Sequence, residues 1–256
     1  RPVRRLLTTA AAVACLGLLG AADASAQNQT PNQDYVAMGD SYSSGNGTGD
    51  YYESNCYRSY QAYGPLIDPD IPGTFPHPAC SGARTNHIDL DSQNGFPKQI
   101  DLLGPNTDYV TLTIGGNDAG FVDALTNCAI PFGGCADSGG SLDDAQDFIR
   151  DDLPALLDRN YAAIRAQAPN AVITVLGYPR IFKPDTTCIL VFSQAEVNKA
   201  NVTADLMNDV MRQRVQAAGP GFAFVDARTA WIGHGACDSA NWINEFSISD
   251  TVGSFH

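Results

Sequence analysis

The chain has 256 residues, which is enough for one α/β domain with a substantial buried core. Its net charge of −13 argues against nucleic acid or an anionic membrane as a standing partner. Apolar residues make up 44% of the chain, as in an ordinary globular protein, and we find no internal repeat and no coiled-coil pattern.

The N-terminus has the three parts of a secretory signal peptide. Arginines begin the chain, residues 6–19 are apolar or small, and residues 24–26 form an Ala-Ser-Ala cleavage site. The apolar run is short for a membrane span. We therefore expect residues 1–26 to be removed on export and the mature protein to be secreted.

The first strand and the turn after it follow a flexible lead-in, which we expect over the polar residues 27–34. Tyr35-Val36-Ala37-Met38 predicts a strand, and Gly39-Asp40-Ser41 predicts an abrupt turn at its end. Ser41 would then lie at the tip of a sheet, where solvent can reach its hydroxyl. Taken alone, the turn requires no chemical role, because Gly, Asp and Ser are common turn residues.

Residues 42–79 predict a long loop, with one helical turn near residues 59–66. The stretch is rich in Gly, Pro, Tyr and Asp and shows no lasting periodicity. Long loops in a domain of this size are usually functional. Its tyrosines either line an apolar cleft or cover the core, and the sequence favours neither: Tyr42, Tyr51, Tyr52, Tyr57, Tyr60 and Tyr63.

A second turn of small residues comes at Cys80-Ser81-Gly82-Ala83, after what we expect to be a short strand. Residues 96–103 predict one or two helical turns. Residues 109–114 are β-branched and predict a strand that ends at Gly115-Gly116-Asn117. Residues 120–140 are rich in Gly and predict a loop with a disulfide.

The second half of the chain alternates helices with strands. Apolar spacing predicts a helix over residues 141–168, restarted at Pro154, and then a buried strand over residues 171–176. A Ser-Gln-Ala-Glu capping box begins the next helix, over residues 193–219, and a last strand covers residues 222–225.

This alternation predicts an α/β fold, a parallel sheet with helices on both faces. In such sheets ligands bind beyond the carboxyl ends of the strands. The turns at Gly39-Asp40-Ser41, Gly82 and Gly115-Gly116-Asn117 each follow a predicted strand. We therefore expect the three turns to gather on one rim of the sheet.

The residues of these turns suit ester hydrolysis by a serine. That chemistry needs a hydroxyl, a base, a group that orients the base, and donors for the oxyanion. Ser41 is the candidate hydroxyl and His256, the last residue, the candidate base. The backbone N–H groups of Ser41 and Gly82 and the side-chain amide of Asn117 are candidate donors. A side chain at Gly82 would hinder close backbone approach. Turn formation alone is the other explanation for Asn117.

Four short blocks carry a family resemblance: residues 39–43 (GDSYS), 80–83 (CSGA), 114–118 (IGGND) and 254–256 (SFH). Together, and in this order, they resemble the signature blocks of the SGNH (GDSL-type) hydrolases, in particular secreted actinobacterial lipases and phospholipases. The resemblance covers residues 34–256. It implies one flavodoxin-like domain over residues 35–256, built as a three-layer α/β/α sandwich with a central parallel sheet.

The same resemblance assigns roles to the residues of the blocks. It implies Ser41 as the nucleophile and His256 as the base, with Ser41, Gly82 and Asn117 as oxyanion donors. It also implies that catalysis uses no metal and no organic cofactor. The sequence itself offers no structural zinc site, because it has no Cys-x-x-Cys and its four histidines are scattered.

Six cysteines follow the predicted signal peptide, and an even number in an exported chain predicts disulfides. Six cysteines allow 15 pairings, and the spacing alone selects none of them. The family resemblance implies three pairs: Cys56–Cys80, Cys128–Cys135 and Cys188–Cys237.

Two features depart from the family pattern. Many members carry an Asp three residues before the catalytic His, where this chain has Gly253, and Asp250 lies six residues before His256. We therefore expect a Ser–His dyad whose imidazole is oriented by the Gly253 carbonyl, with Asp250 as the alternative. Family members usually continue beyond this His, so we expect the chain to be cut inside the motif.

Three other histidines remain. His77 lies between prolines and His234 between glycines, and we expect both to be exposed. His87 follows the Gly82 turn, and we expect it to take no part in the site.

The main hypothesis is a secreted carboxylic ester hydrolase of lipase or esterase type, including phospholipase, that works through a serine acyl-enzyme. One alternative is a carbohydrate esterase that removes acetyl or acyl groups. The other is a binding protein that kept the fold and lost turnover. We expect a monomer that meets small-molecule or lipid esters, touches lipid surfaces only transiently, and binds no nucleic acid.

Overall fold

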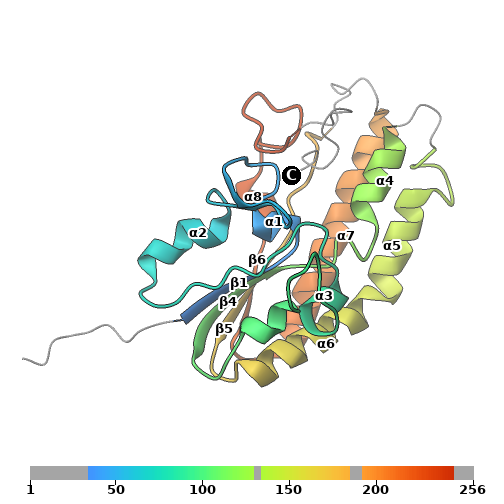
Figure 1. The fold of residues 1–256 in the computed structure, drawn as a ribbon. Coiled ribbons are helices and arrows are strands. Elements are labelled where there is room, and N and C mark those ends of the chain that lie inside the picture. Colours follow the sequence, from blue (N-terminus) through green and yellow to red (C-terminus); the bar gives the residue numbers. More distant parts are fainter. Residues whose placement is uncertain (1–33, 130–133, 185–191, 245–256) are drawn as a thin grey trace, which may run out of the picture. The chain divides into compact units, whose positions relative to one another are not determined.

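The computed structural model describes residues 34–129, 134–184 and 192–244. These residues form a four-stranded parallel sheet with the order β1-β4-β5-β6 (Figure 1). The predicted α/β fold with a parallel sheet is therefore confirmed. The strands are β1 (Asp34–Gly39), β4 (Thr107–Thr113), β5 (Val172–Leu176) and β6 (Phe222–Val225).

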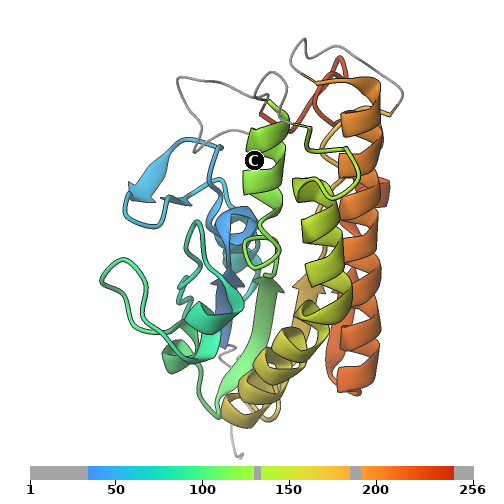
Figure 2. The same ribbon diagram turned by 90° about the vertical axis from the view of Figure 1, so that its right-hand side faces the viewer.

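Helices lie on both sides of this sheet (Figures 1 and 2). α6 (Leu153–Gln167) and α7 (Gln194–Ala218) share a core with the strands on one side, and α5 (Ser141–Asp151) packs against both helices. α2 (Tyr63–Ile67) lies on the other side. In the part of the chain that is described, no helix has the length and the apolar character that crossing a membrane requires.

The buried strand β1 shows why helices are needed on both sides. Val36 and Met38 belong to the core shared with α6 and α7. Tyr35 points to the other side, where its ring lies 5.0 Å from the ring of Phe75. All of these β1 side chains are buried, so the strand is one continuous apolar run, as is usual for a covered parallel sheet.

Residues 74–80 run beside β1 and are joined to it by four backbone hydrogen bonds. Pro76 and Pro78 have no N–H, so this segment cannot complete a regular ladder. The predicted short strand before Gly82 is therefore an irregular edge. Its last bond, from Cys80 N to the Gly39 carbonyl (3.0 Å), carries the Gly82 turn to the rim where β1 ends.

The helix predictions are largely confirmed in the second half of the chain. α5 and α6 cover the predicted helix, with a break at Asp152, and Ser193 and Glu196 form the predicted capping box of α7. The predicted turn within residues 96–103 is a 3-10 helix, Gln99–Leu102.

The structure corrects two of the predicted loops. Residues 120–140 contain the helix α4 (Phe121–Cys128), whose buried Phe121, Ala124, Leu125 and Cys128 have helical spacing that the flanking glycines obscured. Residues 42–79 contain α2, a 3-10 helix (Asp68–Asp70) and a two-stranded antiparallel sheet. The remaining short elements are β2 (Tyr51–Glu53), β3 (Arg58–Ser59), α1 (Ser41–Ser44), α3 (Thr85–Asp89) and α8 (Ala227–Ala230).

Two disulfides lie within the described residues, and both are pairs that the resemblance implies. Cys56 is bonded to Cys80, and Cys128 to Cys135. Cys237 is also disulfide-bonded, whereas its expected partner, Cys188, lies outside the described residues. The Cys56–Cys80 bond ties the start of the Gly82 turn to Cys56. A hydrogen bond from Ser81 N to the Cys56 carbonyl (3.0 Å) reinforces this attachment.

The crowded turn at the end of β1 predicts a large difference in stability between two Gly→Ala variants. Gly39 and Gly49 both have positive φ, at 124° and 73°. A Cβ at Gly39 would overlap the Ser43 hydroxyl and the Thr113 carbonyl, whereas a Cβ at Gly49 would meet no atom within 4 Å.

We expect Gly49→Ala to lower the free energy of unfolding by about 1–2 kcal/mol, the usual cost of left-handed backbone. We expect Gly39→Ala to lower it by roughly 4 kcal/mol or more, because backbone atoms must move. Urea unfolding of both variants measures the difference. Equal losses would show that crowding at Gly39 does not constrain the turn.

Candidate active site

The turn after β1 places Ser41 at the start of α1. Asp40 caps this short helix, and its carboxylate accepts a hydrogen bond from Tyr42 N (3.0 Å). Ser41 is only 4% exposed, less than expected for an open tip. Its hydroxyl has no hydrogen-bond partner among the described residues and is reached through the cavities described below.

The turn after β4 lies beside it, because Gly39 pairs with Thr113 in the sheet. Asn117 follows within this turn, and its side-chain Nδ2 donates to the Ala83 carbonyl (2.8 Å). An amide NH2 carries two hydrogens, so this bond orients the group and leaves one hydrogen for another acceptor. Asn117 is thereby joined to the Gly82 turn, as expected for neighbouring turns on one rim.

Two backbone donors in these turns have no internal acceptor. The N–H groups of Ser41 and Gly82 make no hydrogen bond with any described residue. Ser41 is buried, where most N–H groups in proteins are paired, whereas Gly82 is exposed to solvent. Gly82 has a φ of 77°, and a Cβ there would approach only Gln93 Nε2, at 3.8 Å. Glycine is therefore needed here for the backbone conformation, and crowding within the protein does not explain it.

Ser41 opens into a cleft of about 420 Å³, which we call the serine cleft. The residues that line it come from α1, α2, the loop after α1 and residues 231–244, and none of them carries a charge. Most of its larger side chains are aromatic or aliphatic: Tyr42, Tyr63, Leu66, Trp231 and Trp242.

Two further cavities show how the candidate residues and the loop tyrosines are distributed. A narrow one of about 20 Å³ contains both Ser41 and Asn117, which places these two candidate residues on a common space. A larger one, of about 590 Å³, is lined by Tyr52 and Tyr60 and does not reach Ser41. The six loop tyrosines are thus divided: Tyr42 and Tyr63 line the serine cleft, Tyr52 and Tyr60 line the separate cavity, and Tyr51 and Tyr57 line neither of the two.

A buried polar link joins the two turns, and sequence reasoning missed it. The Tyr178 hydroxyl donates to the Asp40 carboxylate and accepts from Gly116 N (3.0 Å). Tyr178 follows β5, so three strand ends meet in this link. The available signal was its position in the sequence, immediately after Gly177 at the end of a predicted strand.

Burial dominates the electrostatics of this link. It raises the pKa of Asp40 to about 7, and the hydrogen bonds from Tyr178 and Tyr42 reduce the effect without cancelling it. Burial and the nearby Asp40 charge raise the pKa of Tyr178 well above its ordinary value.

Asp118 also connects two of the turns, and sequence reasoning gave it no role. Its carboxylate accepts hydrogen bonds from Thr85 N (2.9 Å) and Thr85 Oγ1 (2.6 Å) at the start of α3. Burial raises the pKa of Asp118. The side chains of Asn117 and Asp118 therefore both hold the turn after β4 against residues 83–85.

The candidate base and its orienting groups, His256, Gly253 and Asp250, lie outside the described residues. Three other histidines are described, and the prediction that His77 is exposed is wrong. His77 is buried between the Tyr52 hydroxyl, which donates to Nδ1 (2.6 Å), and the Ser43 carbonyl, which accepts from Nε2 (2.9 Å). Backbone hydrogen bonds on both sides of His77 hold this segment against β1, and burial lowers the pKa of His77 to about 4.

The other two histidines are also engaged in local contacts. His234 is half-buried: it stacks on Trp242 at a ring distance of 3.6 Å, and its Nδ1 donates to the Ala240 carbonyl (2.6 Å). His87 Nδ1 accepts from Arg84 N (3.0 Å). Within the described ranges, no histidine forms a hydrogen bond with Ser41.

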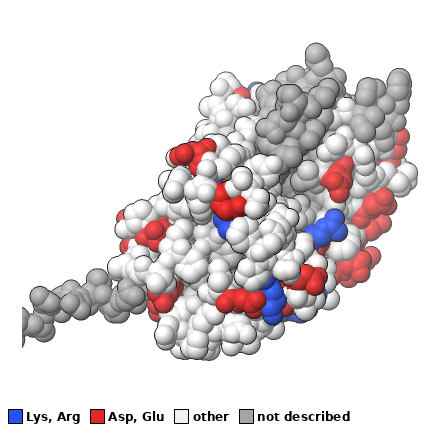
Figure 3. All heavy atoms as spheres, in the orientation of Figure 1, with Lys and Arg blue, Asp and Glu red and all other residues white. Residues whose placement is uncertain are grey.

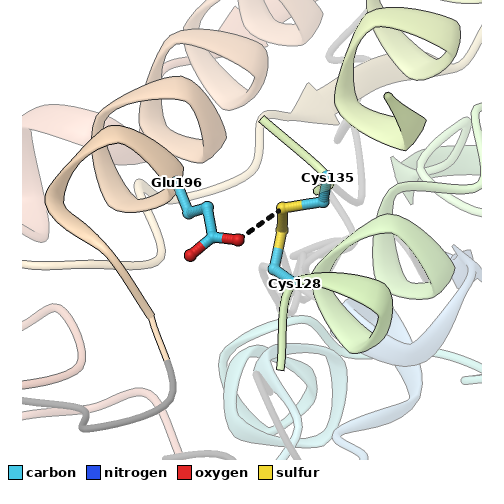
Figure 4. A group of neighbouring side chains, drawn as sticks. All are labelled: Cys128, Cys135 and Glu196. Atoms are coloured by element: carbon cyan, nitrogen blue, oxygen red, sulfur yellow. Dashed lines mark hydrogen bonds between the residues drawn. A yellow bond between two sulfur atoms is a disulfide. The ribbon is translucent and has the colours of Figure 1, made fainter. Parts of the chain in front are cut away.

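One group of side chains has the composition of a metal site, but its chemistry does not fit one. Cys128, Cys135 and Glu196 bring their ligand atoms within 4.8 Å of one another. The two sulfur atoms are bonded to each other, so neither can act as a thiolate ligand (Figure 4). Glu196 lies 3.4 Å from the Cys135 sulfur and caps α7 with its other oxygen.

Comparison with known proteins establishes the class. Residues 37–247 match the GDSL-like Lipase/Acylhydrolase family. The chain belongs to this family and is therefore an ester hydrolase of the lipase or esterase type.

Relatives in Streptomyces narrow the comparison. The chain is 40% identical over 236 residues to a lipase of Streptomyces rimosus, covering 91% of this chain and 84% of that protein. It resembles the crystal structure of an extracellular lipase of Streptomyces rimosus with a TM-score of 0.78 and 39% identity. It resembles that of phospholipase A1 from Streptomyces albidoflavus NA297 with a TM-score of 0.79 and 36% identity. Each structural match covers 88% of this chain and 92% of the other.

The buried Asp40 predicts an unusual pH dependence of stability. Because its pKa is raised to about 7 in the folded protein, the folded state binds this proton more tightly than the unfolded state. The free energy of unfolding that Asp40 contributes is therefore greatest below pH 4 and falls as the pH rises toward 7.

We expect the difference in unfolding free energy, wild type minus Asp40→Asn, to fall by roughly 1 kcal/mol per pH unit between pH 4.5 and 6.5. Above pH 8 the difference is expected to be constant, which serves as the internal control. Urea unfolding of both proteins across this range measures it. A difference independent of pH would contradict the raised pKa of Asp40.

Proposed function

We propose that Ser41 is the nucleophile of this ester hydrolase and that Ser41 N, Gly82 N and the Asn117 amide bind the oxyanion. The observation that carries the proposal is the N–H group of the buried Ser41, which has no acceptor among the described residues. An unpaired buried donor costs stability, and a substrate oxygen would satisfy it. The exposed Gly82 N–H, which also has no acceptor among the described residues, would donate to the same oxygen. The link from Asn117 to Ala83 supports a third donor on the same side.

The proposed mechanism is acyl transfer in two halves. Ser41 Oγ attacks the ester carbonyl carbon while His256 takes its proton, and the carbonyl oxygen becomes an oxyanion. The alcohol leaves with the proton from the imidazolium, and an acyl-serine remains. A water molecule, deprotonated by the same imidazole, then releases the acid. We assign the orientation of His256 to the Gly253 carbonyl, with Asp250 as the alternative.

The polar link around Tyr178 supports this assignment by preorganising the donors. Tyr178 joins Asp40, next to the nucleophile, with Gly116, next to the proposed amide donor. Donors fixed before the reaction stabilise the transition state without reorganisation. The rigid placement of both turns is what an oxyanion site requires.

We propose acyl esters of lipids, including phospholipids, as the substrates. The uncharged, aromatic lining of the serine cleft suits an acyl chain. The similarity to both a lipase and a phospholipase A1 supports the same substrate class. The signal-peptide pattern, the disulfides and the extracellular relative support secretion. We propose that the enzyme acts as a monomer without a metal or organic cofactor.

The first test removes the nucleophile. We expect Ser41→Ala to abolish hydrolysis of p-nitrophenyl esters, because no other hydroxyl replaces the attacking oxygen. We expect Asn117→Ala to lower kcat by about 10²–10³-fold, the usual effect of losing one oxyanion donor. Ser141→Ala is the matched control, since the Ser141 hydroxyl is buried without a partner at the start of α5. Full activity in Ser41→Ala would refute the assignment.

Chain length then separates the two substrate classes. With p-nitrophenyl esters from two to ten acyl carbons, we expect kcat/KM to rise with length if the serine cleft holds an acyl chain. Activity restricted to the acetyl ester would instead favour the carbohydrate esterase that the sequence left open. Binding of long-chain esters without turnover would favour the non-catalytic alternative.

A further inference from the structure

Large apolar side chains are exposed on the serine cleft or directly beside it in the sequence: Leu66 and Trp242 line the cleft, and Ile67 and Ile232 follow the lining residues Leu66 and Trp231. Leu66 and Ile67, on α2, are 60% and 39% exposed, and Ile232 and Trp242 are 76% and 55% exposed. The two groups come from segments more than 150 residues apart, yet Leu66 and Trp242 line the same cleft as Ser41. We call these four residues the apolar rim. Grouped apolar exposure next to a binding site marks an interaction surface more often than scattered exposure does.

The tryptophan of the rim is held in its exposed position. Its ring stacks on His234 and makes an edge contact with Trp231 at a ring distance of 5.4 Å, and its backbone N–H donates to the His234 carbonyl (2.8 Å). Asn244, two residues on, donates to the Gly47 carbonyl and joins this loop to the far side of the cleft (2.8 Å). A fixed, half-exposed tryptophan suits an interface between water and lipid, where an amphipathic ring is favoured.

The charge of the protein around the apolar rim determines which kinds of lipid surface it can bind. None of the residues that line the serine cleft is charged. The ionisable residues near the rim along the chain include Asp68, Asp70 and Asp238, and the whole chain carries −13. Arg228 is equally near, but it is ion-paired with Asp205, Asp209 and Asp226. On the face that Figure 3 shows, acidic side chains outnumber basic ones. Such a surface is repelled by anionic lipids, which attract basic segments instead.

We propose that the apolar rim docks on neutral or zwitterionic lipid surfaces and presents the serine cleft to them. The inference extends the proposed function, because it names the surface from which the enzyme takes its ester. Docking buries Ile232, Leu66 and Trp242 in the headgroup region, directly beside the entrance to Ser41. An acyl chain then passes from the lipid layer into an apolar cleft without crossing bulk water.

The chain provides its own probe for this docking. Its two tryptophans, Trp231 and Trp242, both line the serine cleft, so intrinsic tryptophan fluorescence reports on this region alone. Vesicles of ether-linked phosphatidylcholine contain no acyl ester and keep binding separate from hydrolysis. We expect the emission to shift to shorter wavelength on these vesicles. We expect at least tenfold weaker binding to ether-linked phosphatidylglycerol vesicles at low salt.

A pair of matched variants locates the contact. Ile232 does not line the cleft, and Ile232→Ser is expected to weaken vesicle binding about tenfold, because a buried aliphatic side chain is lost. Val202, 57% exposed on α7, provides the control, since that helix lies across the sheet from α2 (Figure 1). Val202→Ser is expected to leave binding unchanged. Both variants should hydrolyse soluble p-nitrophenyl acetate as the wild type does.

Three results would overturn the proposal. These are no change in emission on phosphatidylcholine, equal effects of Ile232→Ser and Val202→Ser, or a dimer in sedimentation experiments that Ile232→Ser dissociates. The last result would assign the rim to a second copy of the chain. Failure of the proposed function is a separate result, because it would appear as lost hydrolysis of the soluble ester while vesicle binding persists.

Discussion

The hydroxyl of Tyr178 is the contact on which the geometry of the site depends most. It accepts from Gly116 N and donates to the Asp40 carboxylate, so the ends of β1, β4 and β5 meet at one oxygen atom. Asp40 and Gly116 take no part in the proposed chemistry themselves. Asp40 precedes Ser41 in the sequence, and Gly116 precedes Asn117. Such a link is costly to leave incomplete, because its groups are buried, and it fixes two turns relative to each other. The raised pKa of Asp40 is the electrostatic consequence of placing a carboxyl there.

The parallel sheet brings the remaining pieces to the same rim. β1 and β4 are adjacent and in register, so the turns that follow them begin at the same level. The third turn arrives by a different route, along residues 74–80, which follow β1 although their prolines prevent regular pairing. Side chains then complete the arrangement, with Asn117 bonded to Ala83 and Asp118 to Thr85. The serine cleft adjoins Ser41, and α2 and residues 231–244 both contribute to its lining.

Sequence reasoning found those parts of the molecule that depend on local pattern. The four strands of the parallel sheet, the capping box of α7 and the three turns could be predicted, because glycines and apolar runs act within a few residues. The small β2–β3 sheet was missed, and the strand expected before Gly82 is an irregular edge. α4 was missed because glycines on both sides obscured its spacing. His77 was misjudged because its burial depends on Tyr52 and Ser43, which lie more than 20 residues away along the chain. Tyr178 and the apolar rim were missed for the same reason: their roles arise from contacts between distant segments, which a single sequence does not display.

The disulfide at Cys56–Cys80 has a consequence for where the enzyme can work. It ends two residues before Gly82, whose N–H is one of the proposed oxyanion donors. In a reducing cytoplasm this turn would be held by hydrogen bonds alone, whereas the turns of Ser41 and Asn117 do not depend on a covalent link. If Gly82 N binds the oxyanion as proposed, reduction of this disulfide would loosen one of the three donors and leave the other two in place.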